Sequence, residues 1–145
     1  MPLTDAQIRA LFADKQRPSP PASKLMGFEM LNFSVTEGWA DIAFTPRPEF
    51  ANPMGNVQGG FVTAMLDDAM GVAASIHSGF TKFVPTLQLT VTFLKPVGFD
   101  RVTVRGEVLR LGQNTAQLAG TLRLADGSIA ATAVASTAVR DIPRA

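Results

Sequence analysis

The sequence contains no cysteine and only one histidine, which excludes several kinds of site at the outset. Without cysteine there is no disulfide bond, no thiolate zinc site and no cysteine nucleophile. A single histidine, His77, gives little support to a Ser-His-Asp triad or to a zinc site. We therefore expect no metal and no redox cofactor, and the absence of cysteine fits a reducing cytoplasm.

Charge is sparse as well, at 17% of residues with a formal net charge of +1. The basic residues are scattered, so the chain lacks the basic patch of a nucleic-acid-binding protein. Its first residues show no basic region followed by an apolar stretch, as a signal peptide would. Asp67 and Asp68 interrupt the longest apolar run, which argues against a membrane span. We expect a cytoplasmic protein that binds neither nucleic acid nor membrane.

The length of 145 residues predicts one domain, residues 1–145, large enough to bury a substantial core. Within it, residues 1–23 are expected to form a short helix and a proline-rich linker, and residues 24–140 the core. Thr4 and Gln7 form a capping-box pattern at the start of that helix. Three prolines, at positions 18, 20 and 21, cannot continue the helix, so residues 16–23 should end it and serve as the linker.

The remaining chain alternates between strand and helix patterns. Residues 28–44 read as a hairpin turning at residues 37–38, and a long apolar helix should run from near Gly59 to near Gly79. Alternating apolar and polar residues then predict strands within 85–96, 101–112, 115–124 and 128–139. The predicted fold is α+β: a long central helix, apolar on nearly all sides, wrapped by a curved six-stranded antiparallel sheet.

One spaced motif carries most of the functional information: Asn52, Gly55, Gln58, Gly59–Gly60 and Asp67. It resembles the motif of hotdog-fold acyl-CoA thioesterases of the phenylacetate-pathway type, which are related to the hydroxybenzoyl-CoA thioesterases. The resemblance extends over residues 24–140. It implies hydrolysis of an aromatic or medium-chain acyl-CoA, with coenzyme A as part of the substrate, by a homodimer that pairs further into a homotetramer.

The glycines suit the chemistry of thioester cleavage, which needs donors for the developing oxyanion. At a helix N-terminus, free N–H groups and the positive end of the dipole meet, and glycine lets a ligand approach closely. We assign this role to the N–H of Gly59 or of its neighbour Gly60. Tight packing of the helix on the sheet is the alternative explanation for the two glycines.

Asp67 lies nine residues after Gln58, so the two side chains point about 180° apart around one helix. A two-fold dimer would resolve this, with Gln58 and Gly59 from one subunit and Asp67 from its partner, as the resemblance implies. Asp67 would then be the general base that activates water, or the nucleophile of a transient mixed anhydride. A buried carboxylate without chemistry is the alternative for Asp67, and a structural role is favoured for Asp68.

The resemblance implies further roles in the same site. Asn52 would orient the water or the carboxylate, although it also suits a turn before Pro53. Thr86 would hold the attacking water, or else be an ordinary strand residue. The family usually has histidine at the position of Gln58; glutamine can donate a hydrogen bond but cannot act as an acid or base.

Binding residues are expected from the same reasoning. Phosphate groups of coenzyme A would meet basic residues at strand ends, and the acyl group would meet apolar residues of the helix and its preceding loop. The first set is Lys82, Lys95, Arg101 and Arg110, and the second is Phe50, Met54, Phe61, Val62 and Met65. Two other functions stay open: a non-catalytic acyl-CoA-binding module, and a structural or partner-binding hotdog protein.

Overall fold

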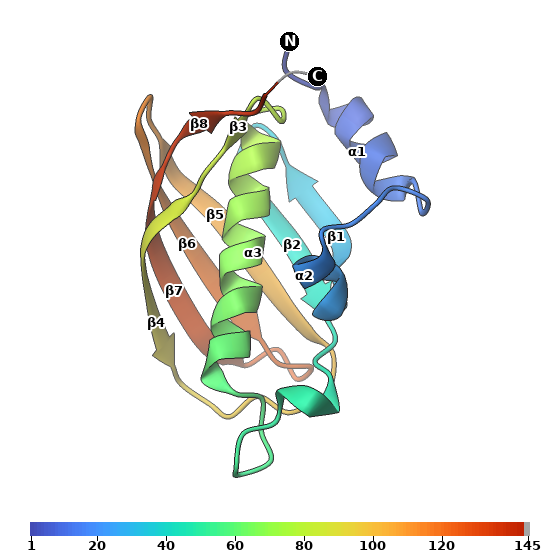
Figure 1. Ribbon diagram of the computed structural model, residues 1–145, viewed down its shortest axis with the longest axis vertical. Coiled ribbons are helices and arrows are strands. Elements are labelled where there is room, and N and C mark those ends of the chain that lie inside the picture. The colour runs from blue at the N-terminus through green and yellow to red at the C-terminus, as the bar shows by residue number, and fades with distance from the viewer. Residues whose placement is uncertain (144–145) are drawn as a thin grey trace.

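A nineteen-residue helix, α3, runs through the middle of the molecule and is enclosed on one side by strands (Figure 1). The structure is a computed structural model and describes residues 1–143. Its elements in chain order are α1 (Asp5–Ala13), α2 (Pro21–Leu25), β1 (Glu29–Ser34), β2 (Trp39–Phe44), the 3-10 turn η1 (Pro48–Phe50), α3 (Gly59–His77), β3 (Lys82–Phe83), β4 (Thr86–Phe93), β5 (Val102–Leu111), β6 (Thr115–Arg123), β7 (Ile129–Ala138) and β8 (Arg140–Asp141).

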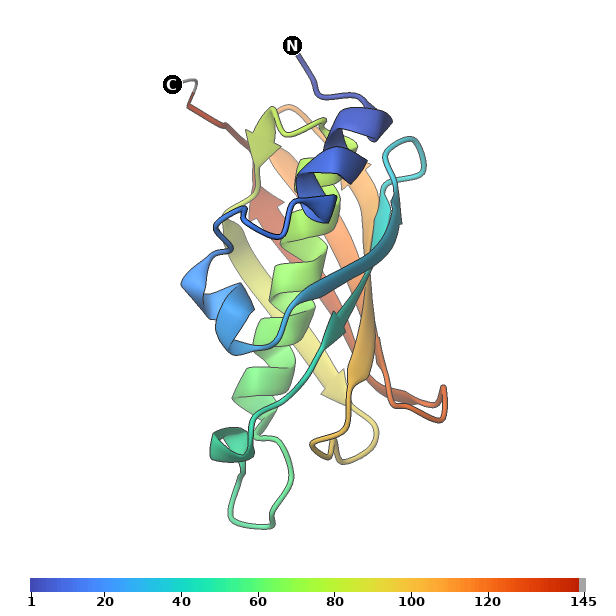
Figure 2. The ribbon, with the colours of Figure 1, turned by 90° about the vertical axis from the view of Figure 1, so that its right-hand side faces the viewer.

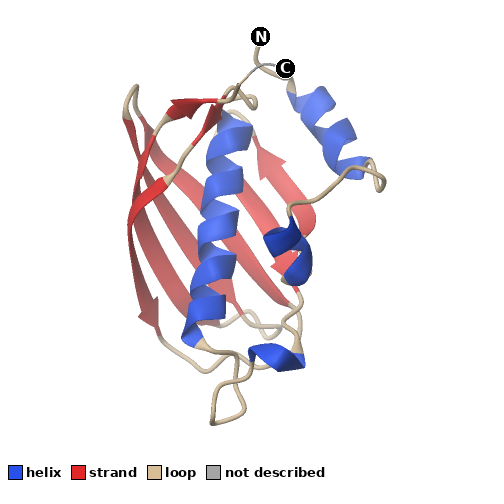
Figure 3. Ribbon diagram, in the orientation of Figure 1, coloured by secondary structure: helices blue, strands red, loops and turns tan. Residues whose placement is uncertain are grey.

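Six strands form one antiparallel sheet in the order β1-β2-β5-β6-β7-β4, and this sheet curves around α3 (Figure 3). The short strands β3 and β8 pair separately. The predicted α+β hotdog architecture, with its central helix and six-stranded antiparallel sheet, is confirmed. No helix within residues 1–143 is both long and apolar enough to cross a membrane.

Two glycines let α3 lie close against the sheet. Gly106 of β5 and Gly120 of β6 are register partners, so they form a gap in the sheet's inner face. A Cβ at Gly106 would lie 2.3 Å from the carbonyl oxygen of Ala69, and one at Gly120 would lie 3.1 Å from Leu66 Cδ2. The helix therefore turns Leu66 and Ala69 toward the sheet. Asp67, one residue or about 100° further round from Leu66, consequently faces away from the sheet.

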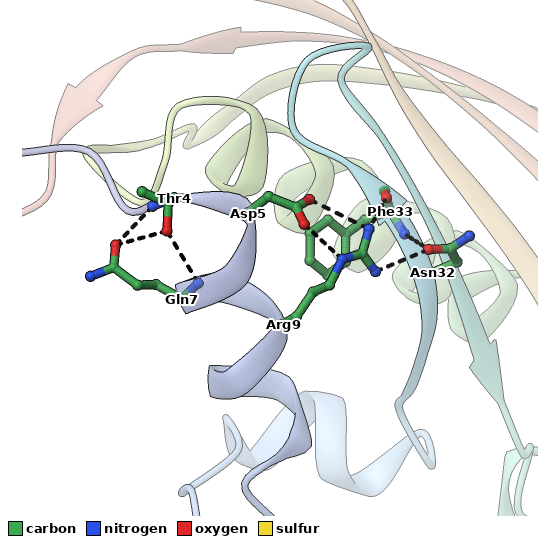
Figure 4. Close-up of polar contacts among 6 residues, drawn as sticks. All are labelled: Thr4, Asp5, Gln7, Arg9, Asn32 and Phe33. Atoms are coloured by element: carbon green, nitrogen blue, oxygen red, sulfur yellow. Dashed lines mark hydrogen bonds and ion pairs between the residues drawn. The ribbon is translucent and has the colours of Figure 1, made fainter.

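The predicted capping box at the start of α1 is confirmed (Figure 4). The hydroxyl of Thr4 accepts a hydrogen bond from the backbone N–H of Gln7, whose side chain accepts one from the N–H of Thr4. Arg9 then ties α1 to β1: its guanidinium donates to the carbonyl of Phe33 and lies 4.4 Å from that ring's centroid. The helix is thereby fixed on the core rather than left as a tail.

The linker differs from the sequence prediction at its end. Residues 16–23 were expected to be a linker without a helix of its own, but α2 begins at Pro21. Proline is well suited to the first position of a helix, where its missing N–H costs no hydrogen bond and its φ is already helical. Figure 2 shows α3 lying between α2 and the sheet. Residues 1–25 thus supply a partial third layer over the outer face of α3.

Candidate functional site

Asp67 and Thr86 meet on the side of α3 that faces away from the sheet. The hydroxyl of Thr86, the first residue of β4, donates a hydrogen bond of 2.8 Å to Asp67 Oδ1. This contact joins two residues that the sequence predicted for one site. It leaves the second carboxylate oxygen of Asp67 without a hydrogen bond from residues 1–143.

Both residues line a cavity of about 740 Å³. Its floor is the outer face of α3, from Asp67 and Asp68 to Ser75, and one wall is the β3–β4 segment. The opposite wall is the N-terminal segment, which we define as residues 11–23. A cavity of this size falls in the range that holds a small ligand. It presents a carboxylate, a hydroxyl and a largely apolar interior to such a ligand.

Asp68 lies beside Asp67 in the same cavity and faces α2. Burial raises the pKa of Asp68 above its usual value; a hydrogen bond from the buried hydroxyl of Ser23 partly opposes this, and the negative charge of Asp67 adds to it. Its Oδ2 is buried without a hydrogen-bond partner within the described residues. These contacts agree with the structural role favoured for Asp68, as an attachment point for α2.

The raised pKa predicts how stability depends on pH. Since the folded protein keeps a proton on Asp68 to higher pH than the unfolded chain does, wild-type stability falls as pH rises from about 4 through the folded-state pKa. Asp68→Asn, which carries no charge, should therefore gain thermal stability relative to wild type at neutral pH, and less so near pH 4. Thermal unfolding of both proteins at the two pH values measures this difference.

Asp126→Asn is the matched control, because this substitution should lower thermal stability at neutral pH instead of raising it. Hydrogen bonds from the side chain and backbone of Ser128 lower the pKa of Asp126, so its contribution is present at neutral pH and lost as the pH falls. An advantage of Asp68→Asn that grew toward acid pH would contradict the assignment of Asp68 as a buried group with a raised pKa.

The N-terminus of α3 presents free donors. Helix geometry leaves the N–H groups of Gly59 and Gly60 without intrahelical partners, and neither donates a hydrogen bond to any acceptor within residues 1–143. Gln58 precedes them as the N-cap, with an exposed side chain that makes no capping bond. The arrangement provides two backbone N–H groups at the positive end of a helix dipole, which suits a ligand oxygen carrying negative charge.

Asn52 closes the loop that leads into α3. Its side-chain Oδ1 accepts hydrogen bonds of 3.0 Å from the backbone N–H groups of Met54 and Asn56. Its own N–H donates to the carbonyl of Asn56 at 2.7 Å. These bonds correspond to the turn role that the sequence allowed. The orienting role toward water or carboxylate stays a prediction.

Within one chain the two halves of the predicted site lie at opposite ends of β4. Asp67 contacts Thr86 at the start of the strand, whereas a Cβ on Gly59 would lie 3.2 Å from the ring of Phe93 at its end. Along α3 itself, eight residue steps place Asp67 roughly 12 Å from Gly59. A single subunit therefore does not bring Asp67 and the helix N-terminus together.

The residues expected around the acyl group lie elsewhere than in this cavity. Val62 and Met65 are fully buried on the sheet side of α3, and Phe50 stacks on Phe61 with ring centroids 4.0 Å apart. Met54 is 85% exposed at the tip of its loop. The cavity wall formed by the N-terminal segment was not predicted from the motif. The only sequence pattern that pointed to this wall was the apolar stripe of the first helix, α1.

The four basic residues expected to meet coenzyme A are dispersed at strand ends. Lys82 forms an ion pair with Asp141, and Arg101 forms one with Glu29 at 2.8 Å. Lys95 and Arg110 are exposed. His77, at the end of α3, has its Nδ1 2.7 Å from the carbonyl oxygen of Val35 and therefore fastens the helix end to the β1–β2 turn.

Comparison with known proteins adds to this geometry. The sequence profile of the family described as Thioesterase superfamily matches residues 54–131, more than half of the chain. The phenylacetic acid degradation-related protein of Ralstonia eutropha has a similar structure, with 27% identity and a TM-score of 0.81 over 88% of this chain and 98% of that one. No curated protein sequence matches this chain closely enough to count as a relative.

Two more distant structures share the fold. One is smu.793 of Streptococcus mutans, solved with acetyl CoA bound, at 20% identity and a TM-score of 0.72 over 90% of this chain and 98% of that one. The other is the PaaI protein from the phenylacetic acid degradation operon of Escherichia coli, at 19% identity and a TM-score of 0.71 over 81% of this chain and 86% of that one.

Proposed function

The chain belongs to the thioesterase superfamily, and we propose that it hydrolyses acyl-CoA thioesters to a free acid and coenzyme A. The observation that carries this proposal is the Asp67–Thr86 pair, which opens onto a cavity large enough for an acyl group. The structural neighbour with bound acetyl CoA supports coenzyme A as the carrier. Aromatic and medium-chain acyl groups are the proposed substrates.

We propose that the working site is shared between two subunits. Strand β4 is an edge of the sheet, and it and the turn that follows expose large apolar side chains: Leu87 is 67%, Phe93 54% and Leu94 56% exposed. Such an edge invites pairing with another copy. In an antiparallel pairing centred on β4, Thr86 of one subunit lies beside the partner subunit's Phe93. Because Gly59 adjoins Phe93, the partner's helix N-terminus then reaches Asp67.

In this composite site each group has a distinct role. The thioester carbonyl oxygen accepts from the Gly59 N–H, which stabilises the negative charge that develops on it. Asp67 either removes a proton from the attacking water or attacks the carbonyl carbon itself to form a mixed anhydride that water then cleaves. The Thr86 hydroxyl holds one carboxylate oxygen, so the other is left to react. In both routes the C–S bond breaks and coenzyme A leaves as the thiol.

The direct test is hydrolysis of a panel of aromatic and medium-chain acyl-CoA esters, measured by the release of the free thiol. Calorimetry measures the binding of coenzyme A in parallel. We expect hydrolysis of at least one ester. Binding without turnover would favour a non-catalytic acyl-CoA-binding module. If the protein neither hydrolyses any of the esters nor binds coenzyme A, a structural or partner-binding function would be favoured.

A further inference from the structure

The cavity beside Asp67 has a strongly aromatic far end. Phe12, Phe28 and Phe80 all line it, and the ring of Phe12 lies 6.3 Å from that of Phe28 and 6.2 Å from that of Phe80. Phe12 comes from α1, so the N-terminal segment completes this wall. The backbone N–H of Phe80 donates to the carbonyl of Ser75, which places the aromatic end about eight helix residues, or roughly 12 Å, beyond Asp67.

Arg17 covers this aromatic end. Its guanidinium carbon lies 5.2 Å from the centroid of Phe12 and 5.9 Å from that of Phe80. Cations are attracted to such ring faces, which holds the long side chain in place. No carboxylate within residues 1–143 forms an ion pair with Arg17. Partial burial lowers the pKa of Arg17, and the charge of Asp14 opposes this.

The other charges around the cavity leave Arg17 as the prominent cation at this end. Asp14 lines the same end and its negative charge acts on Arg17 without forming an ion pair with it, and Glu29 is paired with Arg101. Asp67 and Asp68 lie at the opposite end of the floor, and Lys15 adds a second positive charge on the same linker. The described residues thus give the cavity two carboxylates, Asp67 and Asp68, at one end. At the other end are two cations, Lys15 and Arg17, and one carboxylate, Asp14, and the guanidinium of Arg17 keeps unfilled hydrogen-bonding capacity.

We infer that Arg17 is a specificity-determining residue that favours acyl groups carrying a carboxylate at the end remote from the thioester. This inference rests on the proposed hydrolase function. With the thioester at Asp67, a medium-length acyl group lies along the outer face of α3 and its remote end reaches the aromatic wall. A guanidinium presents a planar fork that matches a carboxylate, and a charge-assisted pair of this kind is stronger than a neutral hydrogen bond.

The test compares hydrolysis of octanoyl-CoA with that of its ω-carboxy counterpart, octanedioyl-CoA, by wild type and by Arg17→Leu. We expect the variant's kcat/KM for the ω-carboxy ester to fall about tenfold or more, since a hydrogen bond to a charged group is lost. Its kcat/KM for octanoyl-CoA should stay the same or rise, because leucine keeps the apolar contact. Arg17→Lys retains the positive charge but not the planar guanidinium. Its kcat/KM for the ω-carboxy ester should lie between those of wild type and Arg17→Leu.

Lys15→Leu is the matched control, because it removes a neighbouring cation that contacts neither aromatic ring. The ratio of kcat/KM for octanedioyl-CoA to kcat/KM for octanoyl-CoA should differ less from the wild-type ratio in Lys15→Leu than in Arg17→Leu. A merely structural role for Arg17 would lower both rates together and leave their ratio unchanged, which would overturn the inference while the proposed function stands. Failure of the wild type to hydrolyse any acyl-CoA ester would overturn both.

Discussion

Asp67→Asn is expected to lower kcat for the best acyl-CoA substrate by on the order of 10²-fold or more. Asparagine has nearly the same shape and can still accept the hydrogen bond from Thr86, so the cavity is kept. It can neither take a proton from water nor attack the carbonyl carbon. Steady-state hydrolysis gives the loss in kcat, and calorimetry with coenzyme A should show nearly unchanged binding.

Asp100→Asn is the control for this substitution. Asp100 is an exposed aspartate before β5, and its conversion to the amide should leave kcat close to that of wild type. A wild-type rate in Asp67→Asn would remove Asp67 from the reaction. Equal losses in both variants would show that the effect is one of overall charge.

Subunit mixing should restore activity between two inactive variants, Asp67→Asn and Gly59→Val. In a mixed dimer, one site combines the intact Gly59 of the first chain with the intact Asp67 of the second, and the other site carries both changes. Random exchange makes half of the dimers mixed, so about one quarter of wild-type specific activity should return. The measurement is hydrolysis after the two proteins are unfolded together and refolded.

A second mixture serves as its control. Asp67→Asn and Thr86→Val both alter the same half of the site, because the two residues touch within one chain. Their mixture should recover no more activity than the average of the separate proteins. Recovery in this mixture, or none in the first, would contradict a site built from the helix N-terminus of one subunit and the carboxylate of the other.

The elements of the core could be predicted from the sequence because the change of period from helix to strand at Pro85 is unambiguous. The rotation of α3 about its own axis could not be predicted from the sequence. It depends on the strand register that places Gly106 opposite Gly120, next to Ala69. That rotation turns Val62 and Met65 to the sheet. From the sequence alone, apolar residues near a motif cannot be assigned to the core or to a cavity wall.

The site was predicted in part for a related reason. The spacing of the motif singled out Asp67, and the resemblance added Thr86 as a residue of the same site. The hydrogen bond between the two was not predicted and is seen only in the structure. The contribution of Arg17 depends on packing between segments far apart in the chain, against Phe80. Such long-range contacts leave no periodic pattern in the sequence, and the prolines that follow Arg17 gave no indication of the short helix α2.

The stretch from Arg9 to Ser23, which includes the N-terminal segment, is held at both ends, by Arg9 on β1 and by Ser23 near Asp68. The residues between them line the cavity without belonging to the sheet. In the proposed scheme, the selection of substrate and its cleavage therefore reside in separate parts of the polypeptide. Under that proposal, changes of a few residues between those two anchors would alter which acyl-CoA esters are hydrolysed without any change to α3 or to the strands that hold Asp67 and Thr86.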